Sequence, residues 1–196
     1  MKRESSDIRR GQIKKAVLDT IRKEGLHNLS TRNLARRVGI SEGAIFRHFK
    51  SKREIITSIM EDVQTELMKD LRVIAESKKP AEERLFQFLH CHIKYFLRNK
   101  GISILLFSEA AHLNYKEMKK NIRSIISDQE SLISKIIKDG IKKSNWNKKV
   151  KIEDIAILYR SIPIAFNVEM LFNRHDIEVE NFCKRMFNLF MGILNK

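Results

Sequence analysis

Proline and glycine are scarce in this sequence, which has two prolines and seven glycines among 196 residues. These residues mark turns, so their scarcity argues against a fold of many short strands joined by tight turns. The abundant residues, among them Lys, Ile, Leu, Arg and Glu, favour long helices instead. The composition therefore predicts an all-α protein.

Long apolar runs and cysteines are also few. No segment approaches the roughly 18 consecutive apolar residues of a membrane span, and no apolar stretch follows residues 1–5. We therefore expect a cytoplasmic protein that is neither exported nor inserted in a membrane. Cys91 and Cys183 form no C-x-x-C pair and lie among apolar residues, which predicts two reduced thiols in the core.

Acidic residues are too few to balance the basic ones, and the net charge is +15. Such an excess implies a polyanionic partner, although total charge does not separate nucleic acid from an anionic membrane surface. The distribution is more informative, because residues 1–56 hold 15 Lys and Arg against 6 Asp and Glu. The basic excess is concentrated near the N-terminus.

The first helix is predicted from Ile8 to Glu24, where apolar residues recur at helical spacing, and Gly25 follows as a C-terminal cap. A short link then ends at Ser30 and Thr31. Either hydroxyl can cap a second helix.

Residues 31–49 have the pattern of a helix-turn-helix. The second helix stops at Gly39, and Ser41 can cap a third helix whose first turn carries Glu42, where a carboxylate favours the helix dipole. A helix-turn-helix needs two short helices, a glycine turn, a small residue where the helices touch, here Ala35, and a second helix with a free face.

The remaining helices are longer. Residues 51–54, Ser-Lys-Arg-Glu, have the S-x-x-E form of a capping box and predict a fourth helix of about 25 residues. Five more helices bring the expected total to about nine. We expect an N-terminal helix-turn-helix domain of three helices in residues 1–52, and a larger helical domain in residues 53–196.

The stretch from Leu29 to Ile55, LSTRNLARRVGISEGAIFRHFKSKREI, resembles the DNA-binding domain of the TetR family of transcriptional regulators. The family pattern is met by Thr31, Leu34, Ala35, Gly39, Ile40, Ser41, Gly43, Ile45, Phe46, His48, Phe49, Lys52 and Ile55. Beyond the first 50 or so residues, only the number and lengths of the helices agree with the family.

The resemblance implies that the helix after Ser41 enters the major groove of double-stranded operator DNA. The candidates for base contacts are Glu42, Gly43, Ala44 and Arg47. The candidates for phosphate contacts are Thr31, Arg32, His48 and Lys52. Arg47 is the strongest candidate, because a guanidinium can bond guanine at two points. The family usually has Tyr where this chain has Phe46, which lacks the hydroxyl that contacts a phosphate and is expected to pack only.

By its helix number, the rest of the chain resembles the family's regulatory domain. The resemblance implies a homodimer formed through the last two helices and a small, apolar effector bound among the middle helices. The candidate lining residues are Phe86, Leu89, His90, Ile93, Phe107, His112, Tyr159, Phe166, Glu169 and Met170. An ordinary place in the core is the more common explanation for apolar residues at this spacing. Arg160 and Glu169 can either orient a ligand or form an ordinary ion pair.

No catalytic or metal-binding constellation stands out. Glu109 and His112 have the E-x-x-H spacing of a di-iron site, which needs a second E-x-x-H and two further carboxylates. The other instance, Glu24 and His27, falls at the end of the first helix. A nucleophile–base pair is also lacking, so we expect no cofactor, no metal and no enzyme activity.

The sequence thus predicts a ligand-responsive repressor that binds a near-palindromic operator as a homodimer. The alternative is a constitutive, nucleoid-associated architectural protein that uses the same DNA-binding module without an effector. Stabilisation of the fold by a ligand would distinguish the two.

Overall fold

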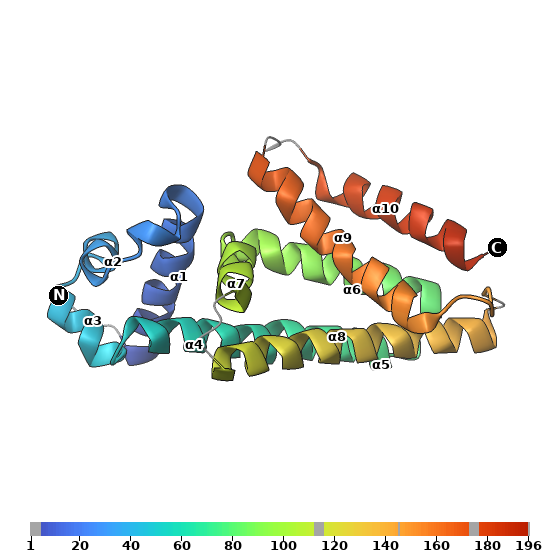
Figure 1. Ribbon diagram of the computed structural model, residues 1–196, viewed down its shortest axis with the longest axis horizontal. Helices are drawn as coiled ribbons and strands as arrows, with labels where there is room; N and C mark the ends of the chain where they lie inside the picture. Colours follow the sequence, from blue (N-terminus) through green and yellow to red (C-terminus); the bar gives the residue numbers. More distant parts are fainter. Residues whose placement is uncertain (1–4, 112–115, 145, 173–176, 196) are drawn as a thin grey trace. The chain divides into compact units, whose positions relative to one another are not determined.

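A computed structural model describes residues 5–111, 116–144, 146–172 and 177–195. Within them the regular elements are all helical (Figure 1): α1 (Ser6–Glu24), a 3-10 turn (Leu26–Asn28), α2 (Thr31–Val38), α3 (Glu42–His48), α4 (Lys52–Asp62), a π-helical turn (Val63–Leu67), α5 (Met68–Glu76), α6 (Ala81–Arg98), α7 (Ile102–Ala111), α8 (Lys116–Lys143), α9 (Ile152–Phe172) and α10 (Val179–Leu194). The expected all-α class with an N-terminal helix-turn-helix is confirmed.

The long helix expected after Ser51 is interrupted. Between α4 and α5, residues Val63–Leu67 form the π-helical turn. Counted as one helix, α4 and α5 bring the described helices to the expected nine. At the start of α4, Ser51 Oγ accepts a hydrogen bond from the Glu54 amide at 3.1 Å, as the capping box requires. The Glu54 carboxylate accepts its return bond from the Lys50 amide at 2.7 Å, one residue before the usual position.

The chain forms two compact units. The first comprises Met1–Val63 and Arg98–Ile122, and the second comprises Gln64–Leu97 and Arg123–Lys196. A compact unit is not the same as a segment that folds alone. The domain boundary expected between residues 52 and 53 therefore stays a prediction.

In the first unit, α1 to α4 and α7 share one apolar core. Its fully or nearly fully buried side chains include Ile13, Val17, Ile21, Leu34, Ile45, Phe49, Ile55, Ile59, Ile102 and Leu105. Gly101, just before α7, has φ +96°, and a Cβ there would overlap the backbone carbonyl of Leu18 on α1. Only glycine allows both this conformation and this close approach.

The second unit contains α5, α6 up to Leu97, α8 from Arg123 onward, α9 and α10. Ring pairs join α9 to α10, with 4.7 Å between the ring centroids of Tyr159 and Phe190 and 5.0 Å between those of Phe166 and Phe182. The Tyr159 hydroxyl donates a hydrogen bond to the Leu85 carbonyl on α6. The elements that join here are far apart in sequence, so this core depends on non-local contacts.

The two cysteines and the apolar character of the helices were also the subject of expectations. Both cysteines are free thiols; Cys183 is buried and Cys91 half-buried. Burial raises the pKa of the Cys183 thiol to about 11, with the nearby Glu180 carboxylate adding to the shift. No helix in the described ranges combines the length and apolar character needed to cross a membrane.

Candidate nucleic-acid interface

The turn between α2 and α3 is fixed by backbone and side-chain caps. Gly39 adopts the left-handed conformation with φ 72°, and its amide bonds the Arg36 carbonyl at 3.4 Å. The Ile40 amide bonds the Ala35 carbonyl at 3.0 Å, which completes a Schellman motif. Ser41 Oγ then accepts the Ala44 amide at 3.2 Å. These local bonds set the angle at which α3 leaves α2.

The two short helices rest on α1 through small and apolar side chains. Leu34, Ala35, Ile45 and Phe49 are buried, as expected for the inner face. Ala44 is also buried, at 8% exposure, so its side chain offers little surface to a base. Its expected base contact remains a prediction, and this burial weakens it.

The outer face of α3 presents Glu42, Gly43, Phe46 and Arg47, which are all exposed. Phe46 is 50% exposed, although the sequence predicted that it packs only. Nothing lies within 4 Å of the position that a Cβ on Gly43 would occupy. Gly43 and Phe46 are three residues apart and therefore share one face of the helix. Sequence reasoning missed the exposed ring, since a phenyl group without the phosphate-contacting hydroxyl was expected only to pack.

Glu42 connects the starts of α2 and α3. Its carboxylate accepts a hydrogen bond from the Thr31 hydroxyl and lies 4.0 Å from Arg32 Nε. The Arg32 side chain remains 91% exposed. Two expected phosphate contacts, Thr31 and Arg32, thus lie beside an expected base contact.

Residues of α1 hold the end of α3. The Arg10 guanidinium donates to the His48 carbonyl, lies 3.9 Å from the centroid of the Phe49 ring and 3.7 Å from Glu54 Oε1. Ser6 Oγ lies 3.4 Å from His48 Nδ1. Sequence reasoning did not identify Arg10, because its partners are about 40 residues away in the chain.

The pKa of His48 lies below its usual value. Burial is the largest cause, followed by the positive charges of Arg47, Arg9 and Arg10. The imidazole is therefore mostly neutral at pH 7, and it can offer a phosphate one N–H donor.

Lys52, the first residue of α4, is held by a hydrogen bond to the backbone. Its ammonium donates to the Leu29 carbonyl at 3.3 Å. An ammonium has three donors, so two protons remain for a phosphate. Lys50 and Arg53 are also exposed next to it in sequence.

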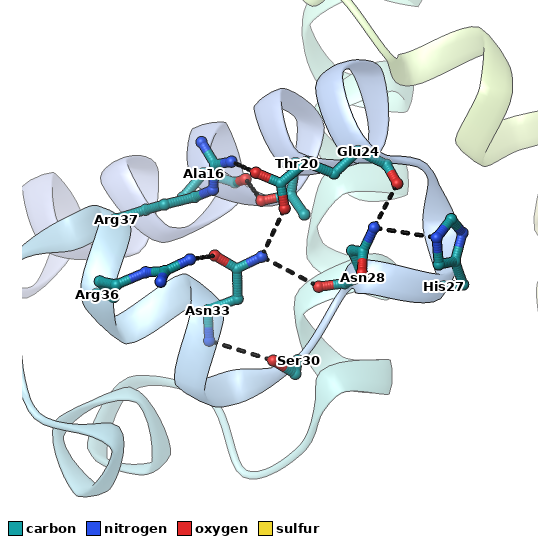
Figure 2. A network of polar contacts seen from close by, with 9 residues as sticks. All are labelled: Ala16, Thr20, Glu24, His27, Asn28, Ser30, Asn33, Arg36 and Arg37. Carbon is teal, nitrogen blue, oxygen red and sulfur yellow. Dashed lines mark hydrogen bonds and ion pairs between the residues drawn. The ribbon is translucent and has the colours of Figure 1, made fainter.

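Arg36 and Arg37 on α2 belong to a network that ends on α1 (Figure 2). Glu24 accepts Asn33 Nδ2 at 2.8 Å and pairs with Arg37, while Arg36 bonds Asn33 Oδ1 at 3.2 Å. The Asn33 hydrogen bond is the main cause that lowers the pKa of the Glu24 carboxyl, and the charge of Arg37 assists. The network locks α2 to α1, so Glu24 has a structural explanation that needs no metal.

The expected effector residues are distributed over both units. On α6 and α9, Leu89, Ile93, Tyr159 and Phe166 are buried. Phe86 and His90 are half-buried and stack at 6.1 Å, and His90 Nε2 lies 3.2 Å from Glu180 of α10.

The other members of the expected set are less enclosed. Glu169 is exposed and Met170 half-buried, while Phe107 lies on α7 in the first unit and is 53% exposed. His112 lies outside the described residues. Arg160 pairs with Glu130 of α8 at 3.1 Å, which favours an ordinary ion pair over a role in orienting a ligand.

The E-x-x-H pattern of Glu109 and His112 was considered above as part of a metal site. Glu109 is buried in the first unit. His112, the second residue of its E-x-x-H pattern, lies outside the described residues. No group of three His, Cys, Asp or Glu side chains with the geometry of a metal site occurs in the described parts of the chain.

Comparison with known proteins identifies the N-terminal helices. Residues 13–59 match the family model of bacterial regulatory proteins of the tetR family. The chain is 26% identical over 147 residues to a nucleoid occlusion factor, SlmA, of Vibrio campbellii, and the match covers 74% of each chain.

Solved structures share the fold over nearly the whole chain. The ketosteroid transcriptional regulator KstR2 of Mycobacterium tuberculosis has a TM-score of 0.82 at 18% identity, covering 96% of this chain and 95% of that one. The transcriptional regulator FadR of Bacillus subtilis, solved in complex with stearoyl-CoA, has a TM-score of 0.76 at 17% identity, covering 94% and 98%. The helix-turn-helix thus lies within a match to the tetR family of bacterial regulatory proteins at residues 13–59, and the chain shares the fold of these solved regulators.

Proposed function

We propose that this chain is a cytoplasmic transcriptional repressor that binds operator DNA as a homodimer and releases it when a small, apolar effector binds. The observation that carries the DNA-binding part is the outer face of α3, where Arg47 and the open backbone at Gly43 are flanked by basic side chains. Such a face suits the major groove, since an arginine can bond guanine and a bare backbone can approach the bases.

In this proposal Arg47 contacts a base, and Thr31, Arg32, His48 and Lys52 contact phosphates. Glu42 and Gly43 complete the base-contacting face, with Ala44 as the weakest member of the set. Phosphate contacts position the module, whereas contacts to base edges select the sequence.

The DNA test uses duplexes enriched from random DNA by the purified full-length protein. Binding of the enriched duplex is then measured at several salt concentrations. A slope that corresponds to fewer than about two phosphate contacts would contradict the proposal.

Arg47→Ala should weaken binding by about 1–3 kcal/mol and relax the preference at one base pair per half-site. Arg22→Ala is the matched control, because Arg22 is an exposed arginine in the last turn of α1. It should leave the base preference unchanged.

The homodimer is supported by apolar side chains on α9 and α10. Six of the ten exposed large apolar residues of the described chain lie there: Ile157, Leu158, Val168, Phe172, Leu189 and Ile193. Leu158, Val168 and Phe172 recur at helical spacing and form one stripe. An exposed stripe of this kind is typical of a surface that a partner covers, and the proposed partner is a second copy of this chain.

Sedimentation of the full chain tests the dimer. Phe172→Glu together with Leu189→Glu should give a monomer, whereas Val73→Glu, at an equally exposed valine on α5, should not. A monomeric wild-type chain at micromolar concentration would overturn this part of the proposal.

The effector site is proposed among α6 and α9 of the second unit, where Phe86, Leu89, His90, Ile93, Tyr159, Phe166 and Met170 supply mainly apolar side chains, with the exposed Glu169 as an outer member. Support comes from FadR of Bacillus subtilis, a protein of the same fold whose structure contains stearoyl-CoA. An effector should raise the melting temperature of the protein and lower its affinity for the enriched duplex.

A second candidate function is a constitutive, nucleoid-associated role without an effector. The similarity to the nucleoid occlusion factor of Vibrio campbellii favours it. Mapping of bound sites in cells separates the two, because a repressor occupies few promoters, while a nucleoid-associated protein occupies many sites outside them.

A further inference from the structure

The second unit contains a polar cavity at the junction of α5, α6 and α8. Its volume is about 400 Å³, and its walls are the last turn of α5, the loop of residues 77–80, the first turn of α6 and the C-terminal end of α8. This volume lies in the range of small-molecule sites. The proposed apolar effector residues do not line it.

The lining of the cavity is strongly basic. It includes five cationic side chains, Lys78, Lys79, Arg84, Lys135 and Lys143, against the two carboxylates of Glu76 and Asp139. Lys135 lies 3.6 Å from Glu76, and Lys79 lies 2.6 Å from Glu83 outside the lining. Among the described residues, Lys78 and Lys143 have no ion pair. The lining therefore has an excess of positive charge that a bound anion would balance.

Arg84 is built into the wall of this cavity. It is 5% exposed, and its guanidinium donates to the Ala75 carbonyl at 2.8 Å and to Asp139 at 2.9 Å. Its buried Nε atom has no hydrogen-bond partner among the described residues. The two hydrogen bonds of the guanidinium hold it in place, so Arg84 contributes a fixed positive charge to the wall.

The positions of the lysines indicate which kind of ligand fits the cavity. Lys78 lies on the loop before α6, whereas Lys135 and Lys143 lie two helical turns apart on α8 and share a face. Cations on two sides of one space fit an anion with several oxygen atoms. The lining contains no aromatic side chain on which a flat ring could stack. We propose that this cavity binds the phosphoryl group of a small phosphorylated molecule, as a polar site distinct from the apolar effector site.

The test measures binding of inorganic pyrophosphate to the full chain by titration calorimetry at constant ionic strength. We expect one site per chain, and at least about tenfold weaker binding to the Lys78→Gln/Lys143→Gln variant, which lacks one cation from the loop before α6 and one from α8. Lys69→Gln/Lys94→Gln is the matched control, because both of these lysines are exposed on helices of the same unit and neither lines the cavity. The control should bind within about twofold of the wild type.

The same variants report on the fold through Trp146, the single tryptophan, which lies against Gly140 in the last turns of α8. Unchanged emission of the free variants shows that weaker binding is not unfolding. Absence of heat up to about 10 mM pyrophosphate, or equal weakening in the control variant, would overturn the site.

Phosphoryl groups also occur along DNA, so a third titration contains the enriched duplex at saturation. Undiminished pyrophosphate binding supports a small-molecule site. Displacement of pyrophosphate by the duplex would assign the cavity to the DNA backbone and overturn the proposal. The pyrophosphate titrations without duplex do not depend on the function of α3, so their failure is distinguishable from failure of the proposed DNA binding.

Discussion

The hydroxyl of Thr31 donates a hydrogen bond to the carboxylate of Glu42, which ties the first residue of α2 to the first residue of α3. This bond places a negative charge within a surface that is otherwise basic. A carboxylate close to DNA phosphates weakens binding by charge repulsion. We therefore infer that Glu42 also selects a base, such as cytosine, whose amino group can donate a hydrogen bond to the carboxylate.

Glu42→Gln should therefore have opposite effects on affinity and selectivity. Binding to unrelated DNA should rise by about three- to tenfold, because a repulsive charge is removed, and the preference at one base pair should fall. Competition between the enriched and a scrambled duplex measures both. Glu61→Gln, the same charge change on the exposed surface of α4, should alter neither selectivity nor affinity by as much.

Phe46 should contact a thymine methyl group. Its ring is 50% exposed on the same face of α3 as Gly43, and an apolar ring favours the methyl of thymine over polar base edges. Replacing individual thymines of the enriched duplex by uracil removes this methyl alone and should weaken binding by about 0.5–1 kcal/mol at one position per half-site.

In Phe46→Ala this difference between thymine and uracil should vanish, whereas Phe107→Ala, at an exposed phenylalanine of α7, should preserve it. If uracil is tolerated at every position by the wild type, the ring does not contact a methyl group.

Gly140→Ala should destabilise the second unit. A Cβ at this position would overlap the indole of Trp146, so either the ring or the helix must move. Overpacking of this kind costs about 1–3 kcal/mol. Gly11 on α1 has no neighbour within 4 Å, and Gly11→Ala should instead stabilise the protein by about 0.5–1 kcal/mol through helix propensity. Urea denaturation followed by Trp146 fluorescence would show whether the two substitutions differ in sign.

The stability of the fold should fall as the pH falls below about 6.5, because of His92. Burial, assisted by the charge of Arg160, lowers the pKa of His92 to about 3 in the folded chain. The unfolded chain binds this proton from about pH 6.5 downward, while the folded chain does not. The contribution of His92 is thus complete above pH 6.5 and decreases by up to about 1.4 kcal/mol per pH unit below it.

Denaturation between pH 7 and pH 5 measures this slope before carboxylates contribute. His92→Gln should flatten the curve, and His27→Gln, at an exposed histidine of the first unit, should not. Wild-type stability that is constant from pH 6.5 to pH 5 would contradict the expectation.

The sequence was a good guide where structure depends on neighbours in the chain. Ser41, Gly39 and Ser51 occupy the capping positions that their types predict, since caps need only residues within one turn. The helix-turn-helix could therefore be located to within a few residues.

Contacts across long sequence distances were not predictable. Arg10 reaches Phe49 and the His48 carbonyl only because α1 packs across the end of α3, and Arg160 pairs with Glu130 rather than with a residue on its own helix. The exposed ring of Phe46 was missed for a related reason. A periodic pattern identifies the faces of a helix, but burial depends on which neighbours cover each face.

The contact between Ser6 and His48 has a practical consequence for anyone who purifies the protein. Ser6 begins α1 next to the end of α3. An affinity tag fused shortly before α1 is expected to lie near the proposed DNA-binding helix and to compete with the duplex for space. We expect a cleavable tag to restore binding upon its removal.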